Sequence, residues 1–333
     1  MDVRGKNIYV GLSGGVDSAA SAALLKRAGA RVTGVFIKGW YPPGMPCTWA
    51  QERRDAMRVA ARLQISFHTL DASAEYKKNV IDYLRDEYRA GRTPNPDVMC
   101  NREVKFGVFH RYARAEGADY IATGHYLSGE KDQRYFLWAV PPAIIAQTVF
   151  PVGDMEKDEV RALAKRFGLP VAQKKDSQGV CFLGNISVDE FLREEFGERS
   201  GRALDGKGAL VGMHDGALLY TLGERVSLRE TREIGPWFVR AKDIEKNELT
   251  VGRTPLQERV FDHGEVLFTD ANWFRQPDGV VEAQCRYRGK RTEGRIEKNR
   301  FTSALPFPEI PAPGQSIVFY QNDELVGGGI IAA

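Results

Sequence analysis

The sequence is poor in cysteine and histidine and contains no long apolar run. Its 333 residues include four cysteines and five histidines, and no two cysteines form a CxxC pair. This spacing argues against a zinc site and against a disulfide-stapled secreted fold. No apolar stretch approaches the length of a membrane-spanning helix, and the N-terminus leads into a strand pattern without a signal peptide. These absences predict a cytoplasmic protein with no membrane partner.

Internal repeats and low-complexity tracts are also absent from the sequence, and neither sign of charge dominates. Lys and Arg number 47 and Asp and Glu 44, so the formal net charge is +3. Such a mild balance permits a nucleic-acid partner without requiring one. A chain of 333 residues is too long for one typical domain, and we expect two or three. Its hydrophobic content of 43% is enough to form their cores.

A glycine-rich segment, Gly11-Leu12-Ser13-Gly14-Gly15-Val16-Asp17-Ser18, lies between a strand pattern and an Ala/Leu-rich helix pattern. A turn of this kind presents free backbone N–H groups to an anion, and Asp17 or Ser18 is expected to cap the helix. A Walker loop would end in Lys followed by Ser or Thr, and Asp17-Ser18 stand there instead. The segment predicts a phosphate site of another type, with an ordinary strand–helix turn as the alternative.

Strand and helix patterns alternate through the first half of the chain. The strand patterns cover residues 8–10, 32–37, 65–70 and 120–123, and helix patterns follow at 19–27, 51–63, 74–90, 106–116 and 156–167. This order predicts an α/β domain with a doubly wound parallel sheet, whose ligands bind at the carboxyl ends of the strands. Gly11, Ile37 and Gly124 lie at such ends.

Beyond about residue 200 the patterns change to short β-rich runs separated by Gly, Asn and Asp turns. Examples are residues 216–222, 236–240 and 316–320. This character predicts small β domains that include a barrel. We therefore expect a catalytic domain over residues 1–195, a small β-rich central domain over 196–252 and a C-terminal β-barrel over 253–333.

Two cysteines lie in local sequences that suit a reactive thiol. Cys100 follows a segment with two prolines, residues 93–97, which predicts an extended and rigid loop. Lys105 lies five residues beyond Cys100, where a cation favours the thiolate. Cys181 is flanked by basic and small polar residues. From spacing alone, a buried small hydrophobe is the more common alternative for each cysteine. A structural role is the preferred interpretation for Cys47, Cys285 and His68.

A basic run with an interleaved aromatic, RYRGKR, occupies residues 286–291. Such a run can contact phosphates and stack on a base, and a solvated strand face is the equally weighted alternative. If the strand continues unbent, Arg286, Arg288 and Lys290 share one face, and Tyr287 and Arg291 share the other.

Several motifs then occur in order along the chain. They read SGGVDS, GRTPNPDVMCN, IATGHY with KDQRYFL, KDSQGVCF, YTLG and PGQSIVFY followed by GGGII. The first resembles the loop of the ATP pyrophosphatase superfamily, which adenylates a substrate and releases pyrophosphate. The whole series, from about residue 10 to residue 331, resembles the bacterial tRNA-specific 2-thiouridylases.

That resemblance implies a sulfurtransferase that acts on tRNA. Enzymes of this family use ATP, with Mg²⁺, to adenylate the 2-oxygen of the wobble uridine, and sulfur from a cysteine persulfide replaces it. The products are 2-thiouridine, AMP and pyrophosphate. The implied partners are tRNA and a sulfur-donor protein, either a cysteine desulfurase or a sulfur relay protein. No resident metal site is implied.

The resemblance also assigns roles to residues. Cys181 matches the persulfide carrier, Cys100 the nucleophile and Asp97 the acid/base beside the target base. ATP would contact Gly11 to Ser18, Ile37 and Gly124. The matched tRNA contacts are Asn95, Pro96, Asp97, His125, Lys131, Asp132, Gln133, Arg286, Tyr287 and Gln315.

Elementary chemistry agrees with two thiols and a nucleotide. An amide-like oxygen is a poor leaving group, so it needs activation as an adenylate before sulfur can displace it. A persulfide supplies sulfur at a suitable oxidation level, and a second cysteine can attack it, with release of sulfide or formation of a disulfide. A single thiol cannot both carry the persulfide and attack it.

Two departures from the family pattern, and two other functions, stay open. The turn between Tyr126 and Lys131 is shorter than usual, and YTLGERVSL at residues 220–228 replaces the usual YTLGQRKGLG, which leaves tRNA docking by the central domain in question. Another pyrophosphate-loop enzyme, such as an amidotransferase-type synthetase or a tRNA lysidine synthetase, would have no use for the two thiols. A tRNA-binding protein without turnover would not need the intact loop.

Overall fold

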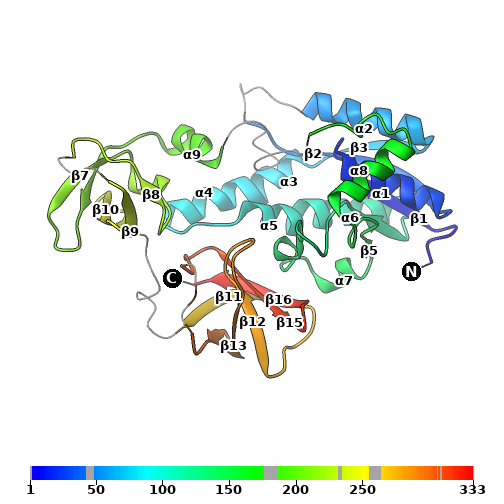
Figure 1. Cartoon of the computed structure of the whole chain (residues 1–333). Helices are drawn as coiled ribbons and strands as arrows, with labels where there is room; N and C mark the ends of the chain where they lie inside the picture. Colours follow the sequence, from blue (N-terminus) through cyan, green and yellow to red (C-terminus); the bar gives the residue numbers. More distant parts are fainter. Residues whose placement is uncertain are drawn as a thin grey trace. The chain divides into compact units, whose positions relative to one another are not determined.

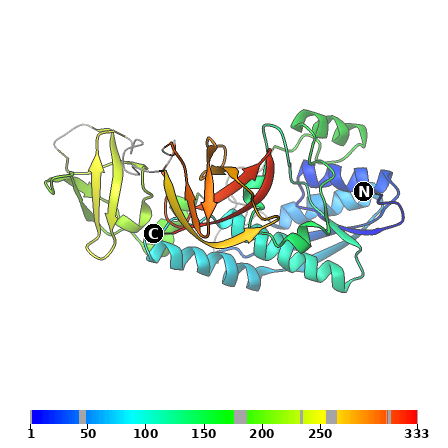
Figure 2. The same cartoon turned by 90° about the horizontal axis from the view of Figure 1, so that it is seen from below.

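The computed structural model describes residues 2–42, 49–175, 187–231, 235–254, 264–305, 307 and 310–332. The chain divides into two compact units, and each is discontinuous in sequence (Figures 1 and 2). The first unit consists of Met1–Ile81 and Asp97–Asn185, and the second of Asp82–Pro96 and Ile186–Ala333. Among the described residues, no helix has both the length and the apolar character needed to cross a membrane.

The first unit is built on a five-stranded sheet in the order β3-β2-β1-β4-β5. The strands are β1 (Asn7–Gly11), β2 (Arg31–Lys38), β3 (Ser66–Asp71), β4 (Tyr120–Ala122) and β5 (Thr148–Val149). All four pairings are parallel. Because β2 and β4 flank β1 on opposite sides, the strand order reverses at β1. The sheet is therefore doubly wound, as expected, and its switch point lies where β1 and β4 end.

The helices of this unit follow the strands in alternation. They are α1 (Val16–Arg27), α2 (Trp49–Leu63), α3 (Ser73–Tyr76), η1 (Lys77–Ile81), α5 (Pro96–Cys100), η2 (Asn101–Val108), α6 (Phe109–Ala115), η3 (Arg134–Phe136), α7 (Pro142–Ile145) and α8 (Lys157–Arg166). Helix α1 is buried on most sides because its small alanines allow close packing, and it shares one apolar core with β1, β2 and α2. This core fixes the start of α1 against the sheet.

The segment before Cys100 differs from the expected extended loop. Helix α5 begins at Pro96, and the helical run continues through η2 and α6 without a break. A proline at the first helical position needs no N–H partner, so it can begin a helix rather than prevent one. Cys100 and Lys105 therefore lie on one helical run.

Among the described residues, the second unit contains two β assemblies, the α-helices α4 (Asp82–Arg89) and α9 (Val188–Phe196), and the 3-10 helix η4 (Ala217–Leu219). A five-stranded sheet has the order β7-β6-β10-β9-β8, and a closed barrel has the order β11-β14-β13-β12-β15-β16. The sheet strands are β6 (Gly201–Leu204), β7 (Leu210–His214), β8 (Arg225–Val226), β9 (Trp237–Asp243) and β10 (Glu248–Gly252). The barrel strands are β11 (Glu265–Trp273), β12 (Val280–Gln284), β13 (Thr292–Glu297), β14 (Arg300–Thr302), β15 (Ser316–Gln321) and β16 (Glu324–Ile331).

Aromatic side chains fill the barrel. Phe268, Phe301 and Phe319 are buried together, and Trp273 stacks on Phe319 with ring centroids 5.5 Å apart. The expected fold class is confirmed: a doubly wound α/β sheet, a small β-rich part and a C-terminal β-barrel.

One expected strand, residues 216–222, is wrong. Residues Ala217–Leu219 form the 3-10 helix η4 instead. Gly216 has φ +145°, and the Ala217 N–H donates to Asn247 Oδ1 at 2.8 Å. A side-chain acceptor thus takes a hydrogen bond that a strand would give to its neighbour, so the local pattern is overridden.

Candidate active site

The glycine-rich loop connects β1 to α1 at the switch point of the parallel sheet. Gly15 is the N-cap of α1, and among the described residues no side chain makes a capping hydrogen bond to this helix. Ser18 Oγ accepts from the Ser13 N–H at 3.3 Å and donates to the Gly15 carbonyl at 3.2 Å. The expected cap by Asp17 or Ser18 is therefore wrong. Within the described part of the chain, no capping side chain competes with an anion for the first N–H groups of α1, as a phosphate site requires.

Asp17 in the first turn of α1 is held by two partners. Lys157 Nζ, from α8, lies 2.7 and 2.8 Å from the two carboxylate oxygens, and Tyr126 Oη donates to Oδ1 at 2.6 Å. The ion pair is mostly shielded, with side chains 13% exposed for Lys157 and 30% for Asp17. Lys157 thus neutralises a carboxylate that would otherwise repel phosphates from the loop.

Lys174 anchors the loop from another direction. Its Nζ donates to the Gly14 carbonyl at 3.1 Å and to Asp55 Oδ2 at 2.8 Å. Gly14 has φ +76°, and a Cβ at this position would overlap the Glu52 carbonyl on α2. Glycine is required here by both conformation and space. Sequence reasoning did not connect Lys157 or Lys174 with the loop, from which both lie far away in the chain.

Gly124 and Ile37 also lie at the carboxyl edge of the sheet. Ile37 is half-buried near the end of β2, and Gly124 follows β4. A Cβ on Gly124 would lie 2.8 Å from the Ser18 nitrogen and 2.9 Å from the Asp17 carbonyl carbon. The structure therefore brings Gly124 directly against the start of α1.

The positive charge of Lys105 affects the pKa of both Asp97 and His125. Burial raises the pKa of Asp97, and the positive charge of Lys105 acts in the opposite direction. Burial, together with the same charge, lowers the pKa of His125 to about 3, so its ring is neutral near pH 7. His125 Nδ1 lies 2.9 Å from Thr123 Oγ1, and the His125 ring lies against Phe106 at 5.4 Å between centroids.

Of the four cysteines, the structure describes two, and both are buried. Cys100 is buried on α5, 3% exposed, and Cys285 is buried in the barrel core, as expected for a packing residue. Cys47 and Cys181 lie outside the residues that the structure describes. A carboxyl group with a raised pKa, a buried thiol and the start of α1 thus all belong to the first unit.

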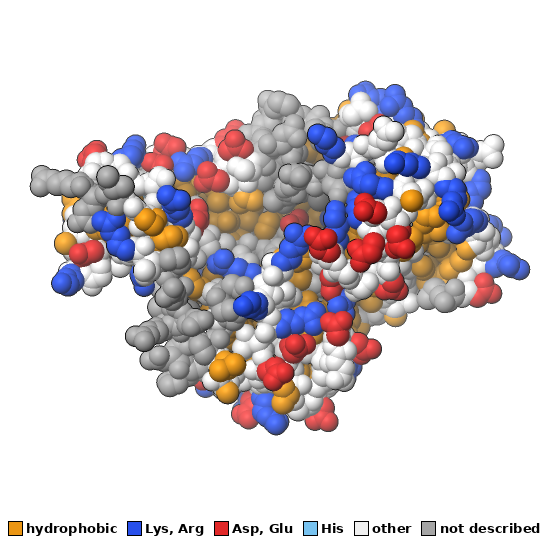
Figure 3. All heavy atoms as spheres, in the orientation of Figure 1, with side chains coloured by type: hydrophobic (Ala, Val, Ile, Leu, Met, Phe, Trp, Pro, Cys, Tyr) orange, Lys and Arg blue, Asp and Glu red, His pale blue; other side chains and the backbone are white. Residues whose placement is uncertain are grey.

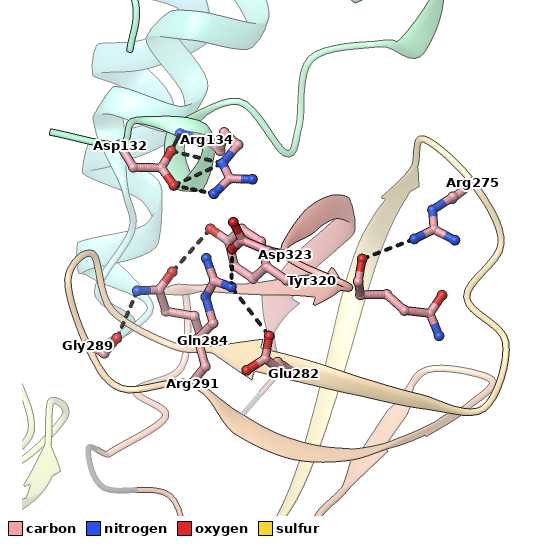
Figure 4. Close-up of polar contacts among 10 residues, drawn as sticks. Asp132, Arg134, Arg275, Glu282, Gln284, Gly289, Arg291, Tyr320 and Asp323 are labelled. Atoms are coloured by element: carbon pink, nitrogen blue, oxygen red, sulfur yellow. Dashed lines mark hydrogen bonds and ion pairs between the residues drawn. The ribbon is translucent and has the colours of Figure 1, made fainter. Parts of the chain in front are cut away.

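The turn that contains Lys131, Asp132 and Gln133 is closed by its own side chains. Gln133 pairs with the Tyr126 backbone, because its N–H donates to the Tyr126 carbonyl at 2.9 Å and its Oε1 accepts from the Tyr126 N–H at 3.1 Å. Asp132 forms an ion pair with Arg134 at 2.7 Å (Figure 4). These contacts explain how the short turn holds its shape.

The basic run in the barrel forms a turn rather than an unbent strand. Strand β12 ends at Gln284, the Gly289 N–H donates to the Arg286 carbonyl at 2.9 Å, and Arg288 has φ +61°. Gln284 Nε2 donates to the Gly289 carbonyl at 2.9 Å and closes the turn. The expected strand face shared by Arg286, Arg288 and Lys290 is therefore wrong. All three are nevertheless exposed, on the turn itself.

Arg291 differs from its neighbours because it packs on the barrel. Its guanidinium carbon lies 3.8 Å from the Tyr320 ring centroid, and Nη1 lies 3.3 Å from Glu282 and 2.8 Å from Asp323 (Figure 4). This arginine is structural. Figure 3 shows Lys and Arg intermixed with Asp and Glu over the visible face, in agreement with the near-balanced composition.

Comparison with known proteins identifies the family. The model for the tRNA methyl transferase HUP domain matches residues 6–185, that for the tRNA methyl transferase PRC-barrel domain 189–253, and that for the aminomethyltransferase beta-barrel domain 263–331. The tRNA-specific 2-thiouridylase MnmA of Akkermansia muciniphila is 41% identical over 348 residues, which cover 97% of each chain. The chain belongs to the tRNA-specific 2-thiouridylase family.

A second relative agrees with membership in the 2-thiouridylase family. The tRNA-specific 2-thiouridylase MnmA of Pseudomonas fluorescens is 39% identical over 358 residues, which cover 99% of this chain and 95% of the relative. Among solved structures, the U34-tRNA thiolase NcsA of Methanococcus maripaludis is 18% identical, with a TM-score of 0.37 over 58% of this chain and 68% of that protein.

Proposed function

We propose that this protein converts the wobble uridine of tRNA to 2-thiouridine. In the first step, ATP adenylates the 2-oxygen of the base and pyrophosphate is released. In the second, sulfur displaces AMP. The observation that carries the proposal is the sequence identity of 41% and 39%, over nearly the whole chain, to two proteins named tRNA-specific 2-thiouridylase. The uncapped helix start at the sheet switch point supports a site for the ATP phosphates.

The proposed nucleotide site consists of residues 11–18, Ile37 and Gly124. Mg²⁺ would accompany the phosphates and neutralise charge as pyrophosphate departs. Within the described part of the chain, no group of three or more His, Cys, Asp or Glu residues offers a complete cage for a metal ion. Asp17 is the carboxylate at the loop, and it would contact the ion only in place of its ion pair with Lys157. We propose that Mg²⁺ arrives with ATP and is held mainly by the substrate phosphates.

The sulfur chemistry is assigned to Cys181 and Cys100. Cys181 receives a sulfur atom as a persulfide from a sulfur-donor protein, either a cysteine desulfurase or a relay protein. A new bond forms between C2 and that sulfur while the bond from C2 to the adenylated oxygen breaks. Attack of the Cys100 thiolate on Cys181 breaks the S–S bond and leaves a disulfide. The two thiols are oxidised, the transferred sulfur is reduced, and a thiol reductant resets the enzyme.

Asp97 is the proposed acid/base that exchanges a proton with the target base. Burial raises the pKa of Asp97, which shifts it in the direction that favours this role. His125, neutral with a pKa of about 3, would contact tRNA as an uncharged ring rather than as a phosphate-binding cation. The other proposed tRNA contacts are Asn95, Pro96, Lys131, Asp132, Gln133, Arg286, Tyr287 and Gln315.

The same proposal covers the organisation and location of the protein. We propose a catalytic domain over residues 1–195, a central domain over 196–252 and a tRNA-binding barrel over 253–333. Placement of α9 in the second compact unit argues for a first boundary somewhat earlier. A substrate such as tRNA favours action in the cytoplasm.

Mass spectrometry of nucleosides from cells that lack the protein tests this function. We expect 2-thiouridine derivatives at the wobble position to disappear and to return when the wild-type chain is supplied. A Cys100→Ser chain should not restore them. Unchanged 2-thiouridine would overturn the proposal. Loss of a methylated nucleoside alone would favour the activity suggested by the names of two of the matching family models.

A further inference from the structure

We propose that Gln315 is a positioning residue, which ties the C-terminal barrel to the segment that leads into α5. This inference rests on the proposed function and deepens it, because Asp97 and Cys100 lie on α5. Gln315 and residues 82–96 belong to the same compact unit. The resemblance assigned Gln315 a contact with tRNA, whereas the structure gives its amide partners within the protein.

The backbone of Gln315 is fixed at the start of β15. Its carbonyl accepts from the Ile331 N–H at 2.8 Å, and its N–H donates to the Ala312 carbonyl at 3.1 Å. From this anchored position, Nε2 donates to the Thr93 carbonyl at 2.9 Å and reaches the Pro94 carbonyl at 3.4 Å. The side-chain amide of Gln315 therefore points at the segment before α5.

That segment has few hydrogen-bond donors of its own. Pro94 and Pro96 lack N–H groups, and Thr93 and Pro94 are buried, so water gives little help. A donor from elsewhere in the fold is needed, and Gln315 supplies it. Loss of that donor would leave a buried carbonyl without its hydrogen bond, which destabilises this position of the segment.

Neighbouring contacts bring the same two stretches of chain together. The Thr93 N–H donates to the Pro313 carbonyl at 2.8 Å. Gly314 has φ +89°, and a Cβ at this position would lie 3.0 Å from both Arg92 Cβ and the Thr93 nitrogen. Only glycine allows this approach. Gln315 thus completes a contact that the backbone has already shaped.

The tie matters for chemistry because the proposed acid/base lies next to the tied segment. Asp97 comes directly after Pro96, and each proline fixes one backbone torsion. Fewer backbone torsions are therefore free to absorb a shift at Thr93 and Pro94 before it reaches Asp97. Displacement of a catalytic group by about 1 Å can cost on the order of 100-fold in rate.

Hydrogen exchange of the tRNA-free protein tests the tie without any need for activity. In Gln315→Glu, which keeps the shape but removes the donor, and in Gln315→Ala, we expect exchange over residues 93–100 to accelerate about tenfold. The matched control is Gln321→Ala, which removes an amide that donates to the Val280 carbonyl at 3.0 Å in the same barrel. It should leave residues 93–100 unchanged. Unchanged exchange in both Gln315 variants would overturn the inference.

Single-turnover thiolation at saturating tRNA separates positioning from tRNA binding. We expect the rate to fall at least about tenfold in Gln315→Glu, whereas the dissociation constant for tRNA changes less than the rate. A weakened tRNA affinity with an unchanged rate would overturn positioning and return Gln315 to the role of a tRNA contact. If the wild-type chain forms no 2-thiouridine, the proposed function fails, and the exchange result still decides whether the tie exists.

Discussion

Asp97 has a raised pKa and lies on the same helical run as Cys100, so its proton is the first feature to test. Asp97→Asn keeps the size of the side chain but cannot exchange a proton. We expect the thiolation rate to fall about 100-fold to 10,000-fold, the usual range for a lost general acid/base, with ATP affinity unchanged. Asp86→Asn, at a side chain 74% exposed, is the matched control and should keep the full rate. Equal rates for Asp97→Asn and wild type would remove Asp97 from the mechanism.

The lowered pKa of His125 makes the stability of the protein depend on pH. Its pKa is about 3 in the folded protein, against about 6.5 in an unfolded chain. Between these values only the unfolded chain binds the proton, so the free energy of unfolding falls as pH decreases from about 6.5 towards 3. The slope from this residue reaches about 1.4 kcal/mol per pH unit. Chemical denaturation across this range should show a shallower slope for His125→Gln, and parallel curves would contradict the burial argument.

Among single residues, the sequence predicted two glycines of the proposed site but not the two lysines that contact the loop. Gly14 and Gly124 were singled out, and both now have a steric reason to be glycine. The contacts of Lys157 and Lys174 with the loop were not predicted, because each meets the loop only after the chain has folded: Lys157 is 140 residues from Asp17, and Lys174 is 160 from Gly14. No local pattern records a partner at that distance.

Among the structural elements, the start of α1 depends on close packing against the residue after β4. Gly124→Ala would place a methyl group 2.8 Å from the Ser18 nitrogen and push the loop out of place. Overpacking of this kind costs about 1–3 kcal/mol, so we expect ATP to bind about tenfold more weakly or worse. Calorimetric titration measures this. Gly206→Ala, where a Cβ meets nothing within 4 Å, is the control, and equal ATP affinities for both variants would contradict the close approach.

The turn between β12 and β13 exposes Arg286 in a way that suits tRNA phosphates. Arg286→Ala should weaken tRNA binding and flatten the dependence of log K on log salt by somewhat under one, the value for about one phosphate contact. ATP affinity should not change. Arg295→Ala, an exposed arginine on β13 of the same barrel, is the matched control and should keep the slope. A normal slope and normal affinity for Arg286→Ala would make the turn a merely solvated surface.

Secondary structure in the first half followed the sequence patterns closely, since the strand and helix periods are distinct there. The failures share one cause. Residues 216–222 and 286–291 have the sequence pattern of strands. Positive φ angles and hydrogen bonds between side chains and the backbone make them form a 3-10 helix and a turn instead. The helix at Pro96 was missed because proline was taken as a sign of an extended loop, whereas it also begins helices.

For the whole molecule, the order of strand and helix patterns predicted the doubly wound sheet. Turn residues (Gly, Asn and Asp) between short strand patterns predicted the β-rich half. The order of the strands around the barrel and the assignment of residues 82–96 to the second unit depend on long-range pairing. Sequence periodicity does not contain that information. The contact of Gln315 with Thr93 was invisible for the same reason.

Transfer of labelled sulfur to tRNA by the purified protein tests the central claim most directly. The enzyme is first loaded with labelled persulfide by a cysteine desulfurase, then mixed with ATP and unmodified tRNA. We predict that the label moves to the wobble uridine as AMP and pyrophosphate appear. Cys100→Ser should take up the label and retain it, and Cys181→Ser should take up none. Release of ADP instead of AMP, or full thiolation by Cys181→Ser, would contradict the account.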